Sequence, residues 1–144
     1  MFRVVLPILL LASSAFSAVE LNFNVTLICR DDVTHGPIQT KRGEWCYGVR
    51  IIEKGINHLL DAQVAQTNYS CLQDNTYAIS FPMKGVLNKK FEIGQYDIAT
   101  EVIHSCSNRG TLLLKRPYSD IPKDSKKYHL NMLIDLFDQG DKTS

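Results

Sequence analysis

The stretch LNFNVTLIC, residues 21–29, decides the fold class of this chain. Its apolar residues fall at every second position, and polar residues occupy most of the positions between them. Successive side chains of a β-strand point to opposite faces, so this alternation predicts a strand with one buried and one exposed face. Cys29 belongs to the buried face. Asn24 belongs to the exposed face, where the sequon Asn24-Val25-Thr26 would accept a glycan.

The same period of two recurs along most of the chain, interrupted by turn residues. Further strands are predicted over 47–52, the later part of 59–69, 76–83, 91–106 (as one strand or two), 111–115 and 128–137. Pro82 cannot donate a ladder hydrogen bond, so its strand is expected at a sheet edge or to end there. We therefore predict one all-β domain over 18–137, a seven- or eight-stranded antiparallel sandwich. A loop over 118–127 and a flexible tail over 138–144 complete this prediction.

The first seventeen residues, MFRVVLPILLLASSAFS, have the pattern of a secretory signal peptide. Arg3 supplies the positive start, a short apolar run follows, and Ala15 and Ser17 are the small residues that precede a cleavage site. A membrane anchor or a buried helix is the alternative, but the apolar run is too short to span a bilayer. Cleavage after Ser17 leaves 144 − 17 = 127 residues in an oxidising compartment.

Four cysteines, an even number in a short exported chain, indicate two disulfides. Zinc sites need close pairs, whereas Cys29, Cys46, Cys71 and Cys106 stand 17, 25 and 35 residues apart, so no metal is expected. If the strands run up and down, all four lie at one end of the sandwich. Sequence allows three pairings, of which we favour Cys29–Cys106 with Cys46–Cys71.

Composition and motifs exclude several classes of function. Without Arg3 the chain has 16 − 1 = 15 Lys+Arg against 15 Asp+Glu, a balance that argues against a nucleic-acid binder. No phosphate loop, G-x-S-x-G or H-E-x-x-H motif occurs, so we expect neither a cofactor nor catalysis. His104 shares a face with Val102 and Cys106, which favours a hydrogen-bonded core histidine over a catalytic one. A second sequon begins at Asn68.

Six short segments in a fixed order carry a family resemblance. They are LIC at 27–29, GVRIIEKG at 48–55, LLD at 59–61, EVIHSC at 101–106, DIPKD at 120–124 and KYHLNMLIDL at 127–136. In this order the chain resembles a divergent member of the transthyretin-like family of small secreted nematode proteins. It lacks the family's further cysteine after His-x-Cys, and Cys46 and Cys71 look additional. The resemblance implies a sandwich similar to transthyretin.

The resemblance also implies a secreted extracellular protein that binds a protein, a cell-surface receptor or lipid. Clustered lysines are the residues expected to contact anionic lipid head groups. They are Lys89, Lys90, Lys123, Lys126 and Lys127. A solvated surface is the alternative interpretation of these lysines.

Three alternatives stay open on sequence alone. One is carriage of a small apolar ligand. Another is hydrolysis as in the hydroxyisourate hydrolases of the related fold, although this chain ends in FDQGDKTS and not in their Tyr-Arg-Gly-Ser. The third is an immunoglobulin-like sandwich, suggested by Cys29, Trp45 and Tyr69-Ser-Cys71. Against it, 73 residues follow Cys71, too many for one final strand.

Overall fold

The computed structural model describes residues 18–30, 43–55, 61–88, 95–122 and 126–143, and these form only β-strands and their connections. The predicted leader, residues 1–17, lies outside the described residues. The strands are β1 (Ala18–Ile28), β2 (Glu44–Glu53), β3 (Ala62–Gln66), β4 (Ser70–Gln73), β5 (Ala78–Asn88), β6 (Gln95–His104), β7 (Leu112–Pro122), β8 (Lys127–Asp135) and β9 (Asp141–Lys142).

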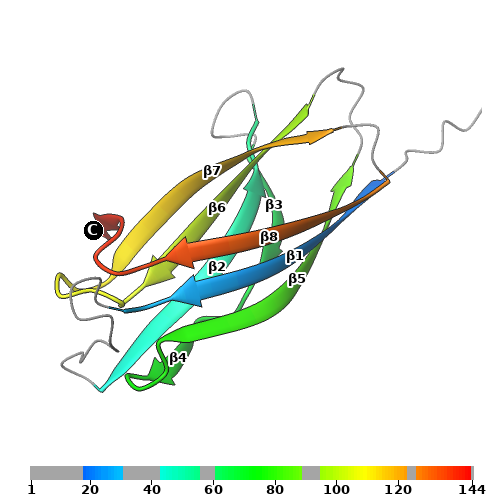
Figure 1. Cartoon of the computed structure of the whole chain (residues 1–144). Coiled ribbons are helices and arrows are strands. Elements are labelled where there is room, and N and C mark those ends of the chain that lie inside the picture. The colour runs from blue at the N-terminus through cyan, green and yellow to red at the C-terminus, as the bar shows by residue number, and fades with distance from the viewer. Residues whose placement is uncertain (1–17, 31–42, 56–60, 89–94, 123–125, 144) are drawn as a thin grey trace, which may run out of the picture.

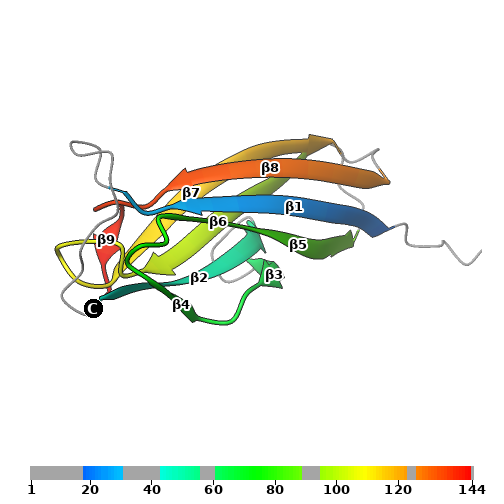
Figure 2. The same cartoon turned by 60° about the horizontal axis from the view of Figure 1, so that its bottom comes forward.

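Two sheets form the sandwich, as predicted (Figure 1). The smaller sheet has the order β5-β1-β8, and the larger has the order β3-β2-β6-β7-β9 with β4 also paired to β2. Figure 2 shows β8, β1 and β5 side by side, with β2, β3 and β4 below them. The described strand pairs are antiparallel, as predicted, with one exception: β1 and β8 pair in parallel. They are the first and the last long strands, and they run side by side in the same direction.

The core lies between the two sheets and is built from the alternation seen in the sequence. Every second residue of β1 is buried, namely Val19, Leu21, Phe23, Val25 and Leu27. Matching residues of the larger sheet face them, among them Trp45, Tyr47, Val49 and Ile51 of β2. The buried residues of β8, Leu130, Met132 and Ile134, continue the same layer.

Both disulfides join the predicted pairs. Cys29 follows β1 in the smaller sheet and Cys106 follows β6 in the larger, so their bond ties the two sheets together. Cys46 and Cys71 stand opposite each other on the adjacent strands β2 and β4. An immunoglobulin-like pattern requires an inter-sheet bond between Cys29 and Cys71, and that pairing is not made.

Several predicted boundaries differ from the observed ones. The later part of 59–69 was expected to be a strand, but β3 ends at Gln66 and β4 begins only at Ser70, so residues 67–69 lie between two strands. The strand predicted at 111–115 extends to Pro122, so much of the expected loop at 118–127 belongs to β7. Pro117 is tolerated there because, among the described strands, β7 pairs along its length with β6, and on its other side it pairs just at Leu112 and Leu113, with β9.

The expected flexible tail also has a defined structure as far as it is described. Asp141 and Lys142 form β9, which pairs antiparallel with Leu113 and Leu112 of β7. Gly140 has a φ of 100°, and a Cβ there would lie 2.6 Å from the Leu113 carbonyl oxygen. Only glycine accepts both this conformation and this close approach. The sequence contains this glycine, but its neighbours are polar and gave no periodic signal.

Candidate functional site

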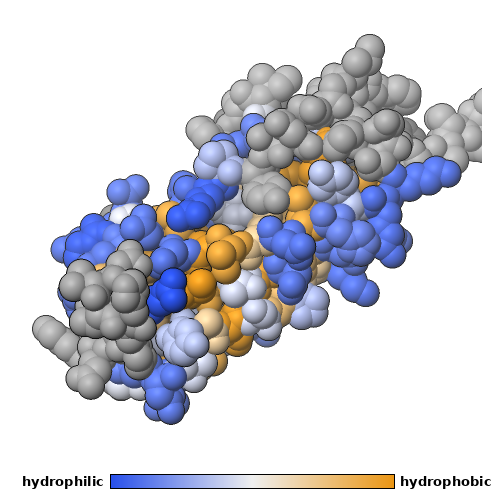
Figure 3. Space-filling model, in the orientation of Figure 1, coloured by the Kyte–Doolittle hydropathy of each residue, from blue (hydrophilic) through white to orange (hydrophobic). Residues whose placement is uncertain are grey.

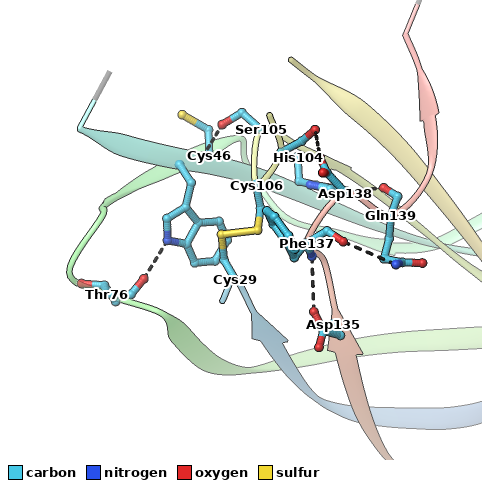
Figure 4. Close-up of a disulfide and its surroundings, with 12 residues drawn as sticks. Cys29, Cys46, Thr76, His104, Ser105, Cys106, Asp135, Phe137, Asp138 and Gln139 are labelled. Atoms are coloured by element: carbon cyan, nitrogen blue, oxygen red, sulfur yellow. Dashed lines mark hydrogen bonds between the residues drawn. A yellow bond between two sulfur atoms is a disulfide. The ribbon is translucent and has the colours of Figure 1, made fainter. Parts of the chain in front are cut away.

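A buried disulfide joins the two sheets at one end of the sandwich. Cys29 and Cys106 are buried, with 5.7 Å between their Cα atoms, and lie beside Phe137 (Figure 4). Trp45 is also buried, and its indole Nε1–H donates a hydrogen bond to the carbonyl oxygen of Thr76 at 2.7 Å. This bond satisfies the one polar atom of the largest buried side chain. The end of the molecule that carries these groups is called the disulfide pole below.

The second disulfide lies at the surface of the same pole. Cys46 is buried, whereas Cys71 is exposed. The backbone N–H of Cys46 donates to the Ser105 hydroxyl at 2.8 Å, and the Ser105 N–H donates to the Cys46 carbonyl at 2.9 Å (Figure 4). Ser105 adjoins Cys106, so the two disulfides are neighbours, and the predicted convergence of the four cysteines is confirmed.

One group of metal-ligand type occurs among the described residues. The side-chain ligand atoms of Glu44, Cys46 and Cys71 lie within 4.8 Å of one another. However, Cys46 and Cys71 are bonded to each other and therefore offer no thiolate to an ion. The arrangement acts as a cross-link between β2 and β4.

His104 has the structural role that the sequence favoured. Its imidazole is fully buried, and Nε2–H donates to the carbonyl oxygen of Gln139 at 2.8 Å (Figure 4). Nδ1 is buried without a hydrogen-bond partner in the part of the chain that the structure describes. Burial lowers the pKa of His104 below 6.5, while the Gln139 carbonyl and the charge of Asp138 oppose this shift. The neutral imidazole thus holds the last turn against β6.

Residues that follow Cys106 bind the same turn at Asp138. Asp138 has a φ of 49°, and its Oδ1 accepts hydrogen bonds from the Ser107 hydroxyl at 2.6 Å and the Asn108 N–H at 3.0 Å. Arg109 donates to the carbonyl oxygens of Asp138 and Gly140. The sequence predicted a flexible tail over 138–144 and no strand over 107–110, and it did not predict that the two segments bind each other.

The outer face of the larger sheet carries a row of charges across three strands. Arg50, Glu101 and Lys115 are direct neighbours on β2, β6 and β7. Glu101 is only 8% exposed and accepts hydrogen bonds from Nε of Arg50 at 2.9 Å and from the same guanidinium's Nη2. Lys115 Nζ lies 3.6 Å from the same carboxylate. The carboxylate thereby holds two solvent-exposed cations in fixed positions on the sheet.

An apolar row adjoins these charges on the same face. Gly48 lies beneath it: a Cβ there would come within 3.2 Å of Ile103 Cγ2 and 3.3 Å of Tyr69 Cδ2. The Tyr69 ring therefore lies close over the strand beside Ile103, and the two are 53% and 36% exposed. Exposed tyrosine and arginine are typical of protein-binding surfaces. We call Arg50, Glu101, Lys115, Tyr69 and Ile103 the outer-sheet patch. The sequence pattern did not predict this patch.

The predicted glycosylation sites are accessible. Asn24 is exposed on the outer face of β1, and Asn68 is exposed two residues before the start of β4. The Thr26 hydroxyl of the first sequon is 2.8 Å from the Ser80 hydroxyl on β5. Both asparagines are therefore exposed, as an attached glycan requires.

The predicted lysine cluster is described only in part. Lys126 and Lys127 are exposed, and Lys127 Nζ lies 3.8 Å from Glu20 Oε2. Glu20 follows the start of β1, so these lysines lie at the end of the smaller sheet opposite the disulfide pole. Lys89, Lys90 and Lys123 lie outside the described residues.

Comparison with known proteins gives little further guidance. No family model matches the chain, and no curated protein matches it. A solved structure, an alternative pilotin from the type II secretion system of Vibrio cholerae, is similar at 8% identity and a TM-score of 0.44. That similarity covers 82% of this chain and 96% of the pilotin. Within the described residues, no helix has the length and apolarity needed to cross a bilayer.

Proposed function

We propose that this chain is an exported, disulfide-stabilised and glycosylated protein that acts outside the cell by binding a partner. Paired cysteines support the proposal: Cys29–Cys106 and Cys46–Cys71 leave no free thiol among the described residues. Disulfides of this kind persist in oxidising compartments. The exposed sequon residues Asn24 and Asn68 and the leader-like first seventeen residues agree with export.

Membership of the transthyretin-like family is part of the same proposal. A single sandwich of two sheets is the fold that the resemblance implies, and His104 and Cys106 of its EVIHSC segment lie in the core. Some members of that family bind at cell surfaces, including to lipid, so a contact surface is expected on this chain.

The observation that carries the proposed binding role is the outer-sheet patch. It combines an exposed aromatic ring and an aliphatic side chain with two cations held by Glu101. Such a surface suits an extracellular protein or receptor that presents apolar side chains beside carboxylates. His104, by contrast, is fully buried and bonded to Gln139, so its imidazole serves the fold.

Binding to intact cells tests this role directly. The mature, oxidised chain is labelled and its binding to cells of the source organism is measured by flow cytometry. We expect Tyr69→Ala combined with Ile103→Ser to weaken binding at least about tenfold, because central aromatic contacts dominate interface energies. Val86→Ser changes an exposed residue of the smaller sheet and is the matched control. Equal binding by both variants would exclude the outer-sheet patch as the contact surface.

A further inference from the structure

The outer edge of β8 offers backbone groups that a further strand can bind. β8, Lys127–Asp135, is the last strand of the smaller sheet, and in the described chain no strand pairs with its outer side (Figures 1 and 2). The opposite edge of this sheet, on β5, differs. It contains Pro82, and its Gly85 packs against the Val64 backbone of β3. Natural proteins protect exposed edges with prolines, bulges or covering segments, and β8 has neither a proline nor a bulge.

The direction of the backbone groups along β8 follows from its bonds to β1. The Leu136 N–H donates to the Ile28 carbonyl at 2.8 Å, and the Lys126 carbonyl accepts from the Glu20 N–H at 3.0 Å. Because N–H and C=O of one residue point to the same side of a strand, even-numbered residues face β1. The odd-numbered residues, from Lys127 to Asp135, direct their N–H and C=O groups to the free edge.

The side chains of β8 alternate in the same phase. Odd-numbered residues are on the outer face or exposed, whereas Leu130, Met132 and Ile134 are buried against the core. Among these odd-numbered residues Leu133 alone is apolar, and its side chain is 68% exposed. In the orientation of Figure 1, Figure 3 shows hydrophobic residues in the middle of the molecule, between hydrophilic ends. A strand that pairs with this edge must therefore have apolar side chains on its core face and polar side chains on its outer face. One of the outer side chains must also cover Leu133.

The sequence of β8 itself meets these demands. KYHLNMLID is self-complementary about its central residue, Asn131, when two copies run antiparallel. Lys127 of one copy then stands opposite Asp135 of the other, which pairs opposite charges at both ends. His129 stands opposite Leu133 and covers it, and Leu130 stands opposite Met132 on the core side. Within the described part of the chain, Asp135 accepts the Phe137 N–H with Oδ1, at 3.3 Å, which leaves Oδ2 for this contact.

The hydrogen-bond phase independently fits the same axis. In an antiparallel pair, residues that exchange both N–H···O=C bonds stand directly opposite each other. An axis at Asn131 pairs odd-numbered residues with odd-numbered residues, the ones whose backbone groups reach the edge. An axis between two residues would instead pair odd-numbered with even-numbered residues, and the even-numbered ones already bond to β1. Moving the axis to Leu130, or by two residues, keeps the phase but separates Lys127 from Asp135.

We propose that the protein forms a two-fold symmetric dimer through β8, with Asn131 on the axis. The two smaller sheets then join into one continuous sheet in the order β5-β1-β8-β8-β1-β5. The symmetric arrangement uses the same strand from both copies, as a closed dimer requires. The outer-sheet patch lies on the other sheet, so the dimer would present two copies of it.

Sedimentation of the mature, oxidised chain over a range of concentrations tests the dimer. Asn131→Pro removes an N–H that points to the free edge, so the β1–β8 ladder remains intact while pairing between copies is blocked. Asn131→Thr keeps the N–H and is the matched control. We expect the proline variant to raise the dimer dissociation constant at least about tenfold and the threonine variant to leave it close to wild type. Circular dichroism of both variants checks that each has folded.

The charges at the strand ends provide a second, independent test. Lys127→Asp or Asp135→Lys alone places like charges opposite each other and should weaken the dimer about two- to fivefold. The double variant restores opposite charges and should recover the lost affinity. A monomer at every concentration, or a dimer that is unchanged by Asn131→Pro, would overturn the proposal. Single charge variants that weaken the dimer without recovery in the double variant would overturn the axis at Asn131.

Discussion

His104 links the stability of the fold to pH at the level of one residue. Its burial lowers the pKa below the ordinary value of 6.5, so below about pH 7 the unfolded chain holds more of this proton than the folded chain. Stability therefore falls as the pH falls from about 7 towards 5, by at most about 1.4 kcal/mol per pH unit from one group.

His104→Gln tests this dependence, because an amide can donate to the Gln139 carbonyl without taking up a proton. We expect urea unfolding of the variant to lose part of the native pH slope in that window. His129→Gln removes an exposed imidazole and serves as the control. A native slope retained by His104→Gln would show that another group is responsible.

Gly85 marks a place where β5 of the smaller sheet and β3 of the larger sheet approach each other closely. A Cβ at this position would lie 2.9 Å from the Val64 carbonyl oxygen and would also meet the Val64 side chain. Backbone atoms cannot move aside as a flexible side chain can, so Gly85→Ala should destabilise the protein by about 1–3 kcal/mol. Denaturant unfolding measures this cost, with Val86→Ala as an exposed neighbour on the same strand. A cost below about 0.5 kcal/mol would contradict the close packing of β5 and β3.

At the level of the elements, the two disulfides should differ in what they contribute. In the chain-entropy model the Cys29–Cys106 bond, with a sequence separation of 77, is worth about 4.5 kcal/mol. The Cys46–Cys71 bond, with a separation of 25, is worth about 3.5 kcal/mol. The first bond is also buried, so its removal adds a packing defect.

Paired serine substitutions at each bridge test this order by denaturant unfolding. We expect the Cys29→Ser/Cys106→Ser variant to be the less stable and to approach complete unfolding. The Cys46→Ser/Cys71→Ser variant should stay folded with β4 loosened. The reverse order would mean that the surface bridge, and not the inter-sheet bridge, organises the disulfide pole.

The sequence predicted those elements whose signal is local. The alternation in LNFNVTLIC describes β1 residue by residue, because one face of β1 packs on the core and the other meets solvent. β2 was harder to predict from alternation, because Ile52 is apolar and buried although it lies on the outer face. The prolines of β7 suggested a loop. A strand accepts proline only where no neighbouring strand needs the missing N–H, and the sequence does not show which strands are neighbours.

The features that the sequence did not predict depend on contacts between distant segments. β9 has only two residues, and its pairing depends on Gly140 meeting the backbone of Leu113. The outer-sheet patch depends on cross-strand register, which brings residues 50, 101 and 115 into one row. Periodicity describes one strand at a time and carries no information about such rows.

For the whole molecule, the end that carries the exposed Lys126 and Lys127 is the one predicted to contact anionic lipid. Exposed lysines near an anionic membrane contribute about 1 kcal/mol each. Co-sedimentation with phosphatidylserine vesicles at low salt, repeated at high salt, measures this contribution. We expect Lys126→Glu combined with Lys127→Glu to reduce any such binding, with Lys115→Glu on the larger sheet as control. No sedimentation on anionic vesicles at low salt would exclude the lipid role.

The position of Asn24 has a consequence for the order of events during synthesis. Asn24 lies in the middle of β1, which is bonded to β5 on one side and to β8 on the other. An oligosaccharyltransferase needs a loose, extended acceptor, and a strand locked on both sides does not offer one. Residues 127–135 are synthesised well after residues 18–28, so β1 cannot acquire its second neighbour until they too have been made. At about 5–20 residues per second, the interval between the two segments amounts to several seconds. The topology thus leaves a translational window in which sugar transfer can precede closure of the sheet.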